Sequence, residues 1–345
     1  MADQAVLLHL SDLHFGEVLL NNQFPFRPLR GFAAHESMLC QALMTATEDV
    51  RAHLHLEDQE EYRIIISGDL TTSGTPKEYG VAHSYVRSRW CLGRELPGIV
   101  WAGKSPHLYL VGLGAESERV ACIPGNHDHW DGRRRPPPAY NPRVFPLQFR
   151  PCPWRKVWRS PGGTLELELY GVDSNSGLQN QLSNLRAKGR VSSQEMQQLE
   201  ALVDESDRKA PPAGCIRVRA MVIHHSLSYV GSKLTHATEL DSQSRADLIT
   251  FAWDHSIGAV LTGHTHDFDF QLFTRRDQSL PHAEVHELRS ASTFQGPAAQ
   301  GKNGFLVHRV VVDGSVALWS TWRYIWNGSR FVRKANQPCL QFKVG

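Results

Sequence analysis

The sequence lacks the features that mark membrane proteins, secreted proteins and zinc-thiolate sites. No uninterrupted apolar stretch is long enough to span a bilayer, and Met1-Ala2-Asp3-Gln4 carries neither the basic region nor the cleavage site of a signal peptide. The six cysteines are scattered and include no C-x-x-C pair. We therefore expect a cytoplasmic protein without a membrane partner, whose cysteines are free thiols rather than disulfides or metal ligands.

The sequence also lacks internal repeats and a strong charge of either sign. A formal net charge of +2 offers no general attraction for nucleic acid, so we do not expect a nucleic-acid partner. The length of 345 residues, with 41% hydrophobic and 21% charged residues, predicts a globular protein with a sizeable core, and we expect one domain over residues 1–345. The compositional oddity is the presence of 18 histidines.

Short apolar runs alternate with segments of helical periodicity, and this alternation predicts an α/β fold. Strands are predicted at residues 6–10, 62–66, 120–123, 165–172, 216–223 and 259–261. Helices are predicted at about residues 35–56 and 75–90, from residue 192 onward, and at about 244–255. Two helices begin with a capping box, Thr75-x-x-Glu78 and Ser192-x-x-Glu195, in which side chains and backbone amides bond reciprocally.

Two further segments bear on burial and topology. Residues 165–172 alternate leucine with glutamate, which predicts a half-exposed strand. The C-terminal part, about residues 284–345, is rich in predicted strands, with hairpin turns at Asp313-Gly314 and Asn327-Gly328.

Five of the predicted strands end in side chains that can bind a metal ion or transfer a proton. These side chains are Asp12 and His14; Asp69; Asn126, His127 and Asp128; His224 and His225; and His264 and His266. Any one group could be a solvated turn or a helix cap, but chance does not readily place all five at carboxyl ends of apolar runs. In a parallel sheet those ends converge along one edge, which is where open α/β sheets bind ligands.

The predicted ligand set contains oxygen and imidazole donors and no thiolate. Such donors suit divalent transition metals of intermediate hardness. The seven of these side chains that are assigned as ligands below are more than one ion uses, and they suit two ions that share a carboxylate. Metal pairs of this kind, about 3.5–4 Å apart, hold the attacking and leaving oxygens of an in-line phosphoryl displacement.

The order of these motifs resembles that of the calcineurin-like metallophosphoesterase superfamily. The motifs are Asp12-x-His14, Gly68-Asp69, Gly125-Asn126-His127-Asp128, His224-His225 and Gly263-His264-Thr265-His266. The resemblance implies a four-layer α/β/β/α sandwich with two divalent ions, of manganese, iron or zinc. It implies that one ion binds Asp12, His14 and His266, that the other binds Asn126, His224 and His264, and that Asp69 bridges them.

The resemblance also implies roles for the residues beside the metals. His127 is expected to be catalytic, as a proton donor or a contact of the transition state, with Asp128 beside it. His224 is preferred to His225 as the ligand because the proline that usually follows this pair in the family would align with Ser226. A metal-bound hydroxide is expected to be the nucleophile, since no serine or cysteine with a neighbouring base occurs at these strand ends.

Departures from the protein phosphatases of this superfamily narrow the expected substrate. Those enzymes carry Asp-Arg-Gly at the bridging aspartate, and the arginine binds the oxygens of a phosphate monoester. Here Leu70 follows Asp69, and Asp128 replaces their glutamate. The sequence is similar to the bacterial cyclic-nucleotide and glycerophosphodiester phosphodiesterase branch, so we expect a small phosphodiester as substrate.

Two other activities and one non-catalytic function fit the same motifs. A phosphomonoesterase or a nucleotide pyrophosphatase would use the same metal centre. A protein-binding scaffold on this fold would be expected to have lost metal ligands, and here every ligand position is filled.

The stretch of about residues 130–161 is rich in proline and arginine. Prolines at this density predict that the stretch is no core element. As a cap over the site, its arginines at 133–135 would bind an anionic substrate, and Trp154 or Trp158 would stack on a base. The alternative is a solvated surface loop whose charges have no function.

Overall fold

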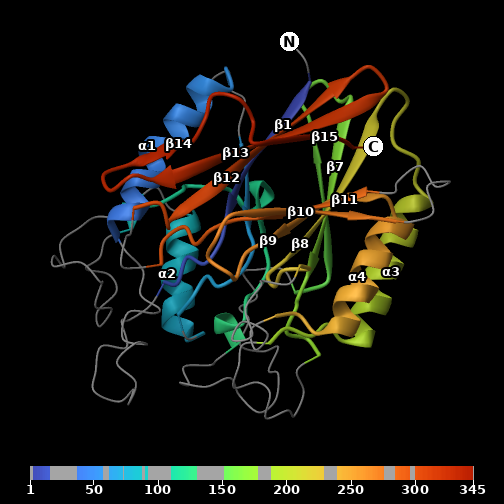
Figure 1. Ribbon diagram of the computed structural model, residues 1–345, viewed down its shortest axis with the longest axis horizontal. Helices are drawn as coiled ribbons and strands as arrows, with labels where there is room; N and C mark the ends of the chain where they lie inside the picture. The colour runs from blue at the N-terminus through green and yellow to red at the C-terminus, as the bar shows by residue number, and fades with distance from the viewer. Residues whose placement is uncertain are drawn as a thin grey trace.

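Two β-sheets lie between two pairs of helices in the computed structural model of the protein (Figure 1). The structure describes residues 3–15, 37–56, 62–72, 74–87, 90–91, 110–129, 151–177, 188–228, 239–275, 284–295 and 300–344. Within these ranges the α-helices are α1 (Ser37–His53), α2 (Pro76–Arg87), α3 (Ser193–Asp207) and α4 (Ser242–Asp254). None of them combines the length and apolarity needed to cross a bilayer.

The first sheet has seven strands in the order β14-β13-β12-β1-β2-β5, and β15 also pairs with β13. Its strands are β1 (Gln4–Leu10), β2 (Arg63–Ile66), β5 (Val120–Cys122), β12 (Gly304–Asp313), β13 (Val316–Trp326), β14 (Phe331–Arg333) and β15 (Leu340–Val344). The strands β1, β2 and β5 are mutually parallel, whereas β12 pairs antiparallel with β1 and the remaining C-terminal strands continue the sheet in antiparallel pairs. Turns at Asp313-Gly314 and Asn327-Gly328 connect β12 to β13 and β13 to β14, as predicted.

The second sheet has six strands in the order β10-β11-β9-β8-β7-β6. Its strands are β6 (Trp154–Arg159), β7 (Leu165–Val172), β8 (Ile216–Ile223), β9 (Ile257–Thr262), β10 (Asp269–Thr274) and β11 (Glu284–Arg289). Neighbouring strands from β7 to β11 along this order are parallel, whereas β6 and β10 are antiparallel edge strands. A separate two-stranded sheet pairs β3 (Trp90–Cys91) with β4 (Leu110–Val111).

Three hydrophobic clusters separate these layers and confirm the four-layer α/β/β/α sandwich. Alternate residues of β1 show the arrangement: Leu8 and Leu10 pack in the cluster under α1 and α2, whereas Leu7 packs between the two sheets. A third cluster joins the second sheet to α3 and α4 through residues such as Leu199 and Leu248. Strands that are buried on both faces explain why β1 and β2 appear in the sequence as continuous apolar runs.

The two predicted capping boxes have different outcomes. At α2, the backbone amide of Thr75 donates to the carboxylate of Glu78, and the amide of Glu78 donates to Thr75 Oγ1, so this box is confirmed. At α3, Ser192 accepts from the amide of Glu195, but the Glu195 carboxylate accepts instead from the backbone amide of Asp173. The start of α3 was therefore predicted correctly, whereas the carboxylate of Glu195 binds the backbone directly after β7.

The end of the proline- and arginine-rich stretch forms strand β6, contrary to the prediction that it holds no core element. Trp154 and Trp158 are 3% and 6% exposed and pack between the sheets, so they do not stack on a substrate. The arginines at 133–135 lie outside the described residues.

Side chains of β6 join the edges of the two sheets. Three alternate residues of β6 donate to three backbone carbonyls along the edge at β5: Trp154 Nε1 to Cys122 at 3.1 Å, Lys156 Nζ to Val120 at 2.7 Å and Trp158 Nε1 to Glu118 at 2.7 Å. The carbonyls of an edge strand otherwise need water or another strand as partner. This ladder therefore closes the sandwich on the side of β5 and β6.

The glutamates of β7 are buried, so the predicted half-exposed strand is wrong. All eight residues of β7 are buried. Glu166 and Glu168 lie opposite Arg217 and Arg219 of β8 in the strand register and form ion pairs with them, and Glu168 also pairs with Arg155 of β6. Alternation of leucine and glutamate therefore marks paired charges on neighbouring strands here rather than a solvated face.

Replacing Glu168 by glutamine is expected to lower the free energy of unfolding by about 3–5 kcal/mol, because breaking a buried ion pair leaves uncompensated charges. The guanidinium-bearing side chains of Arg155 and Arg219 are only 19% and 10% exposed. Urea denaturation measures the change. Glu205→Gln is the control and should change the stability by no more than about 1 kcal/mol, since the side chains of Glu205 and its partner Lys209 are 55% and 63% exposed.

The pH dependence of stability in the wild type and in Glu168→Gln gives a second test. Burial opposes ionisation of Glu168, but hydrogen bonds from Ser206, Arg155 and Arg219 outweigh it and lower its pKa from 4.5 to about 2. The stabilisation is therefore complete above about pH 4.5 and is lost as the pH falls towards 2. The difference in unfolding free energy between wild type and Glu168→Gln should narrow over this range, and a difference that widens would contradict the assignment.

Candidate metal centre

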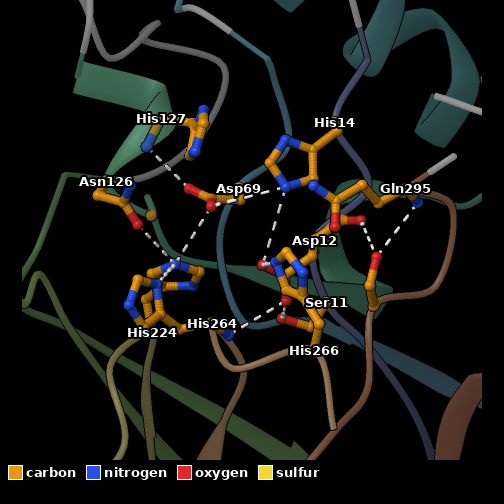
Figure 2. Close-up of polar contacts among 12 residues, drawn as sticks. Ser11, Asp12, His14, Asp69, Asn126, His127, His224, His264, His266 and Gln295 are labelled. Carbon is orange, nitrogen blue, oxygen red and sulfur yellow. Dashed lines mark hydrogen bonds and ion pairs between the residues drawn. The ribbon is translucent and has the colours of Figure 1, made fainter. Parts of the chain in front are cut away.

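The five predicted strand ends meet in one place, but they come from two sheets rather than from one. The ends of β1, β2 and β5 in the first sheet carry Asp12, His14, Asp69 and Asn126. The ends of β8 and β9 in the second sheet carry His224, His264 and His266. Figure 2 shows these side chains pointing toward one another across the junction. The prediction of a single sheet edge was incomplete because strand pairing across the chain is not encoded in the local pattern.

Asp12 directs one carboxylate oxygen into the site and uses the other to hold the loops. Its Oδ2 accepts from Ser11 Oγ at 2.5 Å and from the backbone amide of His264 at 3.1 Å. Its Oδ1 lies 3.2 Å from His266 Nε2 and 3.9 Å from His14 Nε2. These three side chains form one candidate set of metal donors.

Asp69 lies between the two halves of the site (Figure 2). Its Oδ1 accepts from the backbone amide of His127 at 2.9 Å. Its Oδ2 lies 3.8 Å from His14 Nε2 and 3.4 Å from His224 Nε2, one donor from each half. A carboxylate oxygen in this position can be shared by two cations.

The second candidate set groups Asn126, His224 and His264 around Asp69. His224 Nε2 lies 3.1 Å from Asn126 Oδ1 and 3.2 Å from His264 Nδ1. His224 Nδ1 donates to the carbonyl of Ser67 at 2.7 Å, which leaves the lone pair of Nε2 directed at the site. A backbone carbonyl that fixes the tautomer in this way is typical of metal-binding histidines.

The neighbouring His225 has a different partner. Its Nδ1 lies 2.6 Å from Ser174 Oγ, and its ring is absent from the candidate donor groups found among the described residues. The geometry therefore places His224, rather than His225, among the donors.

Buried donor atoms without hydrogen bonds indicate that a cation fits this site. Asp12, His14 and His224 are fully buried, and within the described structure neither Asp12 Oδ1 nor His14 Nε2 has a hydrogen-bond partner. Polar atoms left this way are costly unless an ion or another polar group binds them. Oxygen and imidazole donors without thiolate suit manganese, iron or zinc.

The electrostatics of the two histidines facing Asp69 differ. Burial lowers the pKa of His14 to about 3, so its imidazole is neutral and can offer a lone pair. Burial also disfavours the charged form of His224, but the carboxylates of Asp69 and Asp12 outweigh it and raise the pKa to about 9. These carboxylates therefore favour positive charge at Nε2, where a metal cation would take the place of the proton.

The backbone at the site adopts conformations that are rare for residues with side chains. Among the described residues seven non-glycine residues have positive φ, and five of them are Asp12, His14, Asp69, His264 and His266. Each such residue costs of order 1–3 kcal/mol, and such strain clusters at functional sites. Parallel backbone bonds beyond the strands, such as His14 N to Asp69 O at 2.9 Å, hold these turns in place.

Two glycines permit the close approach of the loops. A Cβ at Gly125 would overlap the Asp69 carboxylate, and a Cβ at Gly68, whose φ is +104°, would overlap the His224 ring. Glycine at these positions therefore brings the donors of β2, β5 and β8 within reach of the same ions.

His127 points into the site beside Asp69, in the short 3-10 turn His127–His129. One ring nitrogen lies within 4.8 Å of donor atoms of both His14 and Asp69. The Nδ1 atom of the His127 ring donates to the carbonyl of Thr72 at 2.8 Å. This bond leaves Nε2 available to the site. A protonated Nε2 could donate to a leaving oxygen, so the expected catalytic role stays a prediction that the geometry permits.

Asp128 joins the loops that follow β2 and β5. Its carboxylate accepts from the amides of Gly125, Leu70 and Thr71 at 2.9, 3.1 and 2.9 Å and from Thr71 Oγ1 at 2.7 Å. Burial and the nearby charge of Asp69 raise its pKa to about 6. Because these donors occupy both oxygens, the carboxylate holds the loops after β2 and β5 in position, and the catalytic role expected for Asp128 stays a prediction.

Two polar residues near the site were missed by the analysis of the sequence. Asp173 follows β7 and lies 3.1 Å from Nε2 of His129, and its position after a strand is the same signal that identified the other groups. Arg289 ends β11, is 2% exposed, and binds Ser226 Oγ at 2.7 Å and Thr265 Oγ1 at 3.4 Å. No local pattern predicted that this arginine joins the loops after β8 and β9.

The sequence matches a known family model over most of its length. The model described as calcineurin-like phosphoesterase matches residues 5–268, a range that contains all seven candidate ligands. A comparison with curated proteins finds no match.

The solved structures to which this chain is similar differ strongly from it in sequence. Purple acid phosphatase PPD1 from yellow lupin (Lupinus luteus) seeds is 12% identical with a TM-score of 0.48, covering 99% of this chain and 54% of that one. A putative 5'-nucleotidase from Staphylococcus aureus is 14% identical with a TM-score of 0.39, covering 90% and 51%. A single mutant of Vps29 from Entamoeba histolytica is 9% identical with a TM-score of 0.33, covering 99% of both chains. This chain spans about half the length of the first two.

Proposed function

Because this chain belongs to the calcineurin-like phosphoesterase family, we propose that it hydrolyses small phosphodiesters with two divalent metal ions. The proposed ligands are Asp12, His14, Asp69, Asn126, His224, His264 and His266. The observation that carries the proposal is the position of Asp69 Oδ2, within 4 Å of one imidazole from each half of the site. One ion in each half would share this oxygen.

The preference for diesters rests on the loop after β2. A phosphate monoester carries two negative charges, and an arginine in this loop would bind them. Residues 70–72 are Leu70, Thr71 and Thr72, whose polar groups bind Asp128 and the backbone of the β1 loop. A singly charged diester needs no such cation, which supports substrates of the cyclic-nucleotide or glycerophosphodiester kind.

The residues of the chain bind, orient and transfer protons around the substrate. Bound divalent ions polarise phosphoryl oxygens and lower the pKa of water, so that a nucleophile forms at neutral pH. Asp12 and Asp69 neutralise the cations, and each keeps one oxygen bonded to a loop amide so that its orientation is fixed. His127 is proposed to protonate the leaving oxygen, while the Thr72 carbonyl accepts the Nδ1 proton and holds the ring.

A cytoplasmic location is part of this proposal. The side chains of Cys122, Cys152, Cys215 and Cys339 are free thiols. Free thiols persist in a reducing compartment.

Matched nitrophenyl substrates test the proposal. The protein is stripped of metal, reconstituted with manganese or zinc, and assayed on bis(p-nitrophenyl) phosphate, p-nitrophenyl phosphate and a nucleoside diphosphate. The first two release the same phenol, so their comparison isolates the charge of the substrate. We expect kcat/KM for the diester to exceed that for the monoester by about tenfold or more, equivalent to about 1.4 kcal/mol. Faster hydrolysis of the monoester or the pyrophosphate would assign the centre to that activity instead.

His264→Ala serves as the control for metal dependence in the same assay. It removes one donor of the second set and leaves the loop after β2 unchanged. Diester hydrolysis that survives in this variant at the wild-type rate would show that the activity comes from a contaminant or from another site.

A further inference from the structure

A row of buried polar side chains crosses the first sheet and ends beside the metal centre. Trp319 lies on β13, His308 on β12, His9 on β1, and Ser67 directly after β2, so each belongs to the next strand in the sheet order. Their exposed fractions are all 0%, and Trp319 packs in the cluster between the sheets. The proposed ligand set uses none of these four side chains, although two of them are histidines.

The four side chains form a continuous hydrogen-bonded chain. Trp319 Nε1 donates to His308 Nδ1 at 3.3 Å, and His308 Nε2 lies 3.3 Å from His9 Nδ1. His9 Nε2 lies 3.0 Å from Ser67 Oγ. The carbonyl of the same Ser67 accepts the Nδ1 proton of His224 at 2.7 Å. The chain thus reaches the residue that orients a candidate metal ligand.

The direction of these bonds follows from the groups around His308 Nδ1, which are the indole of Trp319 at 3.3 Å and the hydroxyl of Thr321 at 2.9 Å. Both histidines are neutral, because burial lowers the pKa of His9 to about 3 and that of His308 well below its ordinary value. A neutral imidazole has one donor and one acceptor, and an indole N–H can only donate. Trp319 therefore makes His308 Nδ1 the acceptor, His308 donates from Nε2 to His9, and His9 donates from Nε2 to Ser67 Oγ.

Ser67 completes the chain without changing its direction. Its hydroxyl accepts from His9 and donates to the carbonyl of Leu10 at 3.4 Å, and its backbone amide donates to the same carbonyl at 3.0 Å. The residue is thus held through both its side chain and its backbone. The opposite direction would place a proton on His308 Nδ1, which would donate to Thr321 Oγ1 at 2.9 Å but face the indole proton, and the bond to Trp319 would be lost.

We propose that the chain from Trp319 through His308 and His9 to Ser67 is a positioning network for the metal-binding imidazole of His224. By fixing Ser67, the network keeps the Ser67 carbonyl in place. This carbonyl accepts the Nδ1 proton of His224, so that Nε2 is left as the metal donor. The inference rests on the proposed metal centre, but it assigns residues outside it. Groups that orient a metal-binding histidine change metal affinity by about 10–100-fold when removed.

The tautomers of the two buried histidines give the first test, in metal-free protein. Nitrogen-15 NMR of the imidazoles should show His308 and His9 protonated at Nε2. Trp319→Phe keeps an aromatic ring but removes the donor, so His308 should gain a population protonated at Nδ1. Trp322→Phe is the matched control, because its indole donates to the carbonyl of Asn336 at 3.3 Å outside the chain. Wild-type rings protonated at Nδ1 would overturn the proposal.

Zinc affinity, measured by competition with a chelator, gives the second test. Trp319→Phe and Ser67→Ala should weaken binding by about 10–100-fold, whereas Trp322→Phe should stay within about twofold of wild type. Ser67→Ala removes only one oxygen, so it remains informative if the tryptophan variant fails to fold. Unchanged zinc affinity in Ser67→Ala would refute the positioning role.

These outcomes are distinct from failure of the proposed activity. Neither the tautomers nor the zinc affinity depends on turnover of a substrate. A protein that binds zinc as expected but hydrolyses no diester would contradict the proposed function and leave the network standing.

Discussion

Replacing Asp69 by asparagine is expected to remove metal and activity together. Asp69 Oδ2 faces His14 at 3.8 Å and His224 at 3.4 Å, so this carboxylate would help to hold both candidate ions. An amide is neutral and binds a second cation poorly, so both sites should weaken at once. Diester hydrolysis should fall by roughly 10³-fold or more, equivalent to about 4 kcal/mol of transition-state stabilisation. Elemental analysis should show metal content falling from about two ions per chain.

Asp173→Asn is the matched control for this experiment. Asp173 is also a buried aspartate at the carboxyl end of a strand, with 1% exposure, but its carboxylate pairs with His129 and lies outside the donor groups of the described residues. This variant should keep both ions. Full metal occupancy with unchanged turnover in Asp69→Asn would exclude the shared carboxylate.

Replacing His127 by alanine is expected to lower kcat by roughly 10²–10⁴-fold while metal stays bound. The ring takes no part in either half of the assigned ligand set, and its backbone amide, which bonds Asp69 Oδ1, remains in the alanine variant. Metal content and kcat are measured on the same preparation. If the ring donates a proton, the loss in kcat should shrink for a diester whose leaving group is very acidic.

Two outcomes would assign His127 a different role. Loss of metal in His127→Ala would make the ring a ligand or a support for Asn126, its neighbour in the chain. A loss in kcat that is the same for acidic and basic leaving groups would make it a contact of the phosphoryl oxygens rather than a proton donor.

The chemistry of the site could be predicted because the residues that indicate it are close together in the sequence. A strand of apolar residues followed by Asp12-x-His14 or by Gly125-Asn126-His127 places donors at a strand end whatever the rest of the chain does. The capping box at Thr75 is equally local, since its two bonds join residues three apart. Patterns of this kind depend only on neighbours in the sequence.

Predictions that depended on the neighbouring strands were wrong. Glu168 looks solvent-facing in its own strand, and only the pairing with β8, which brings Arg219 opposite, makes burial of its charge possible. Trp154 and Trp158 lie in a segment of many prolines, and only the edge of β5 supplies the carbonyls that their indoles bind. In each case the partner is remote in the chain.

The sequence by itself determined which side chains are candidate metal ligands, because apolar runs that end in Asp, Asn and His carry that information locally. Only the tertiary structure decided how these side chains are oriented. The left-handed backbone at Asp12, Asp69 and His264 is unfavourable for an isolated turn and is held by bonds between loops of different strands. Likewise, the hydrogen-bonded chain that begins at the indole of Trp319 reaches Ser67, beside the candidate metal centre, only because four strands lie side by side in one sheet.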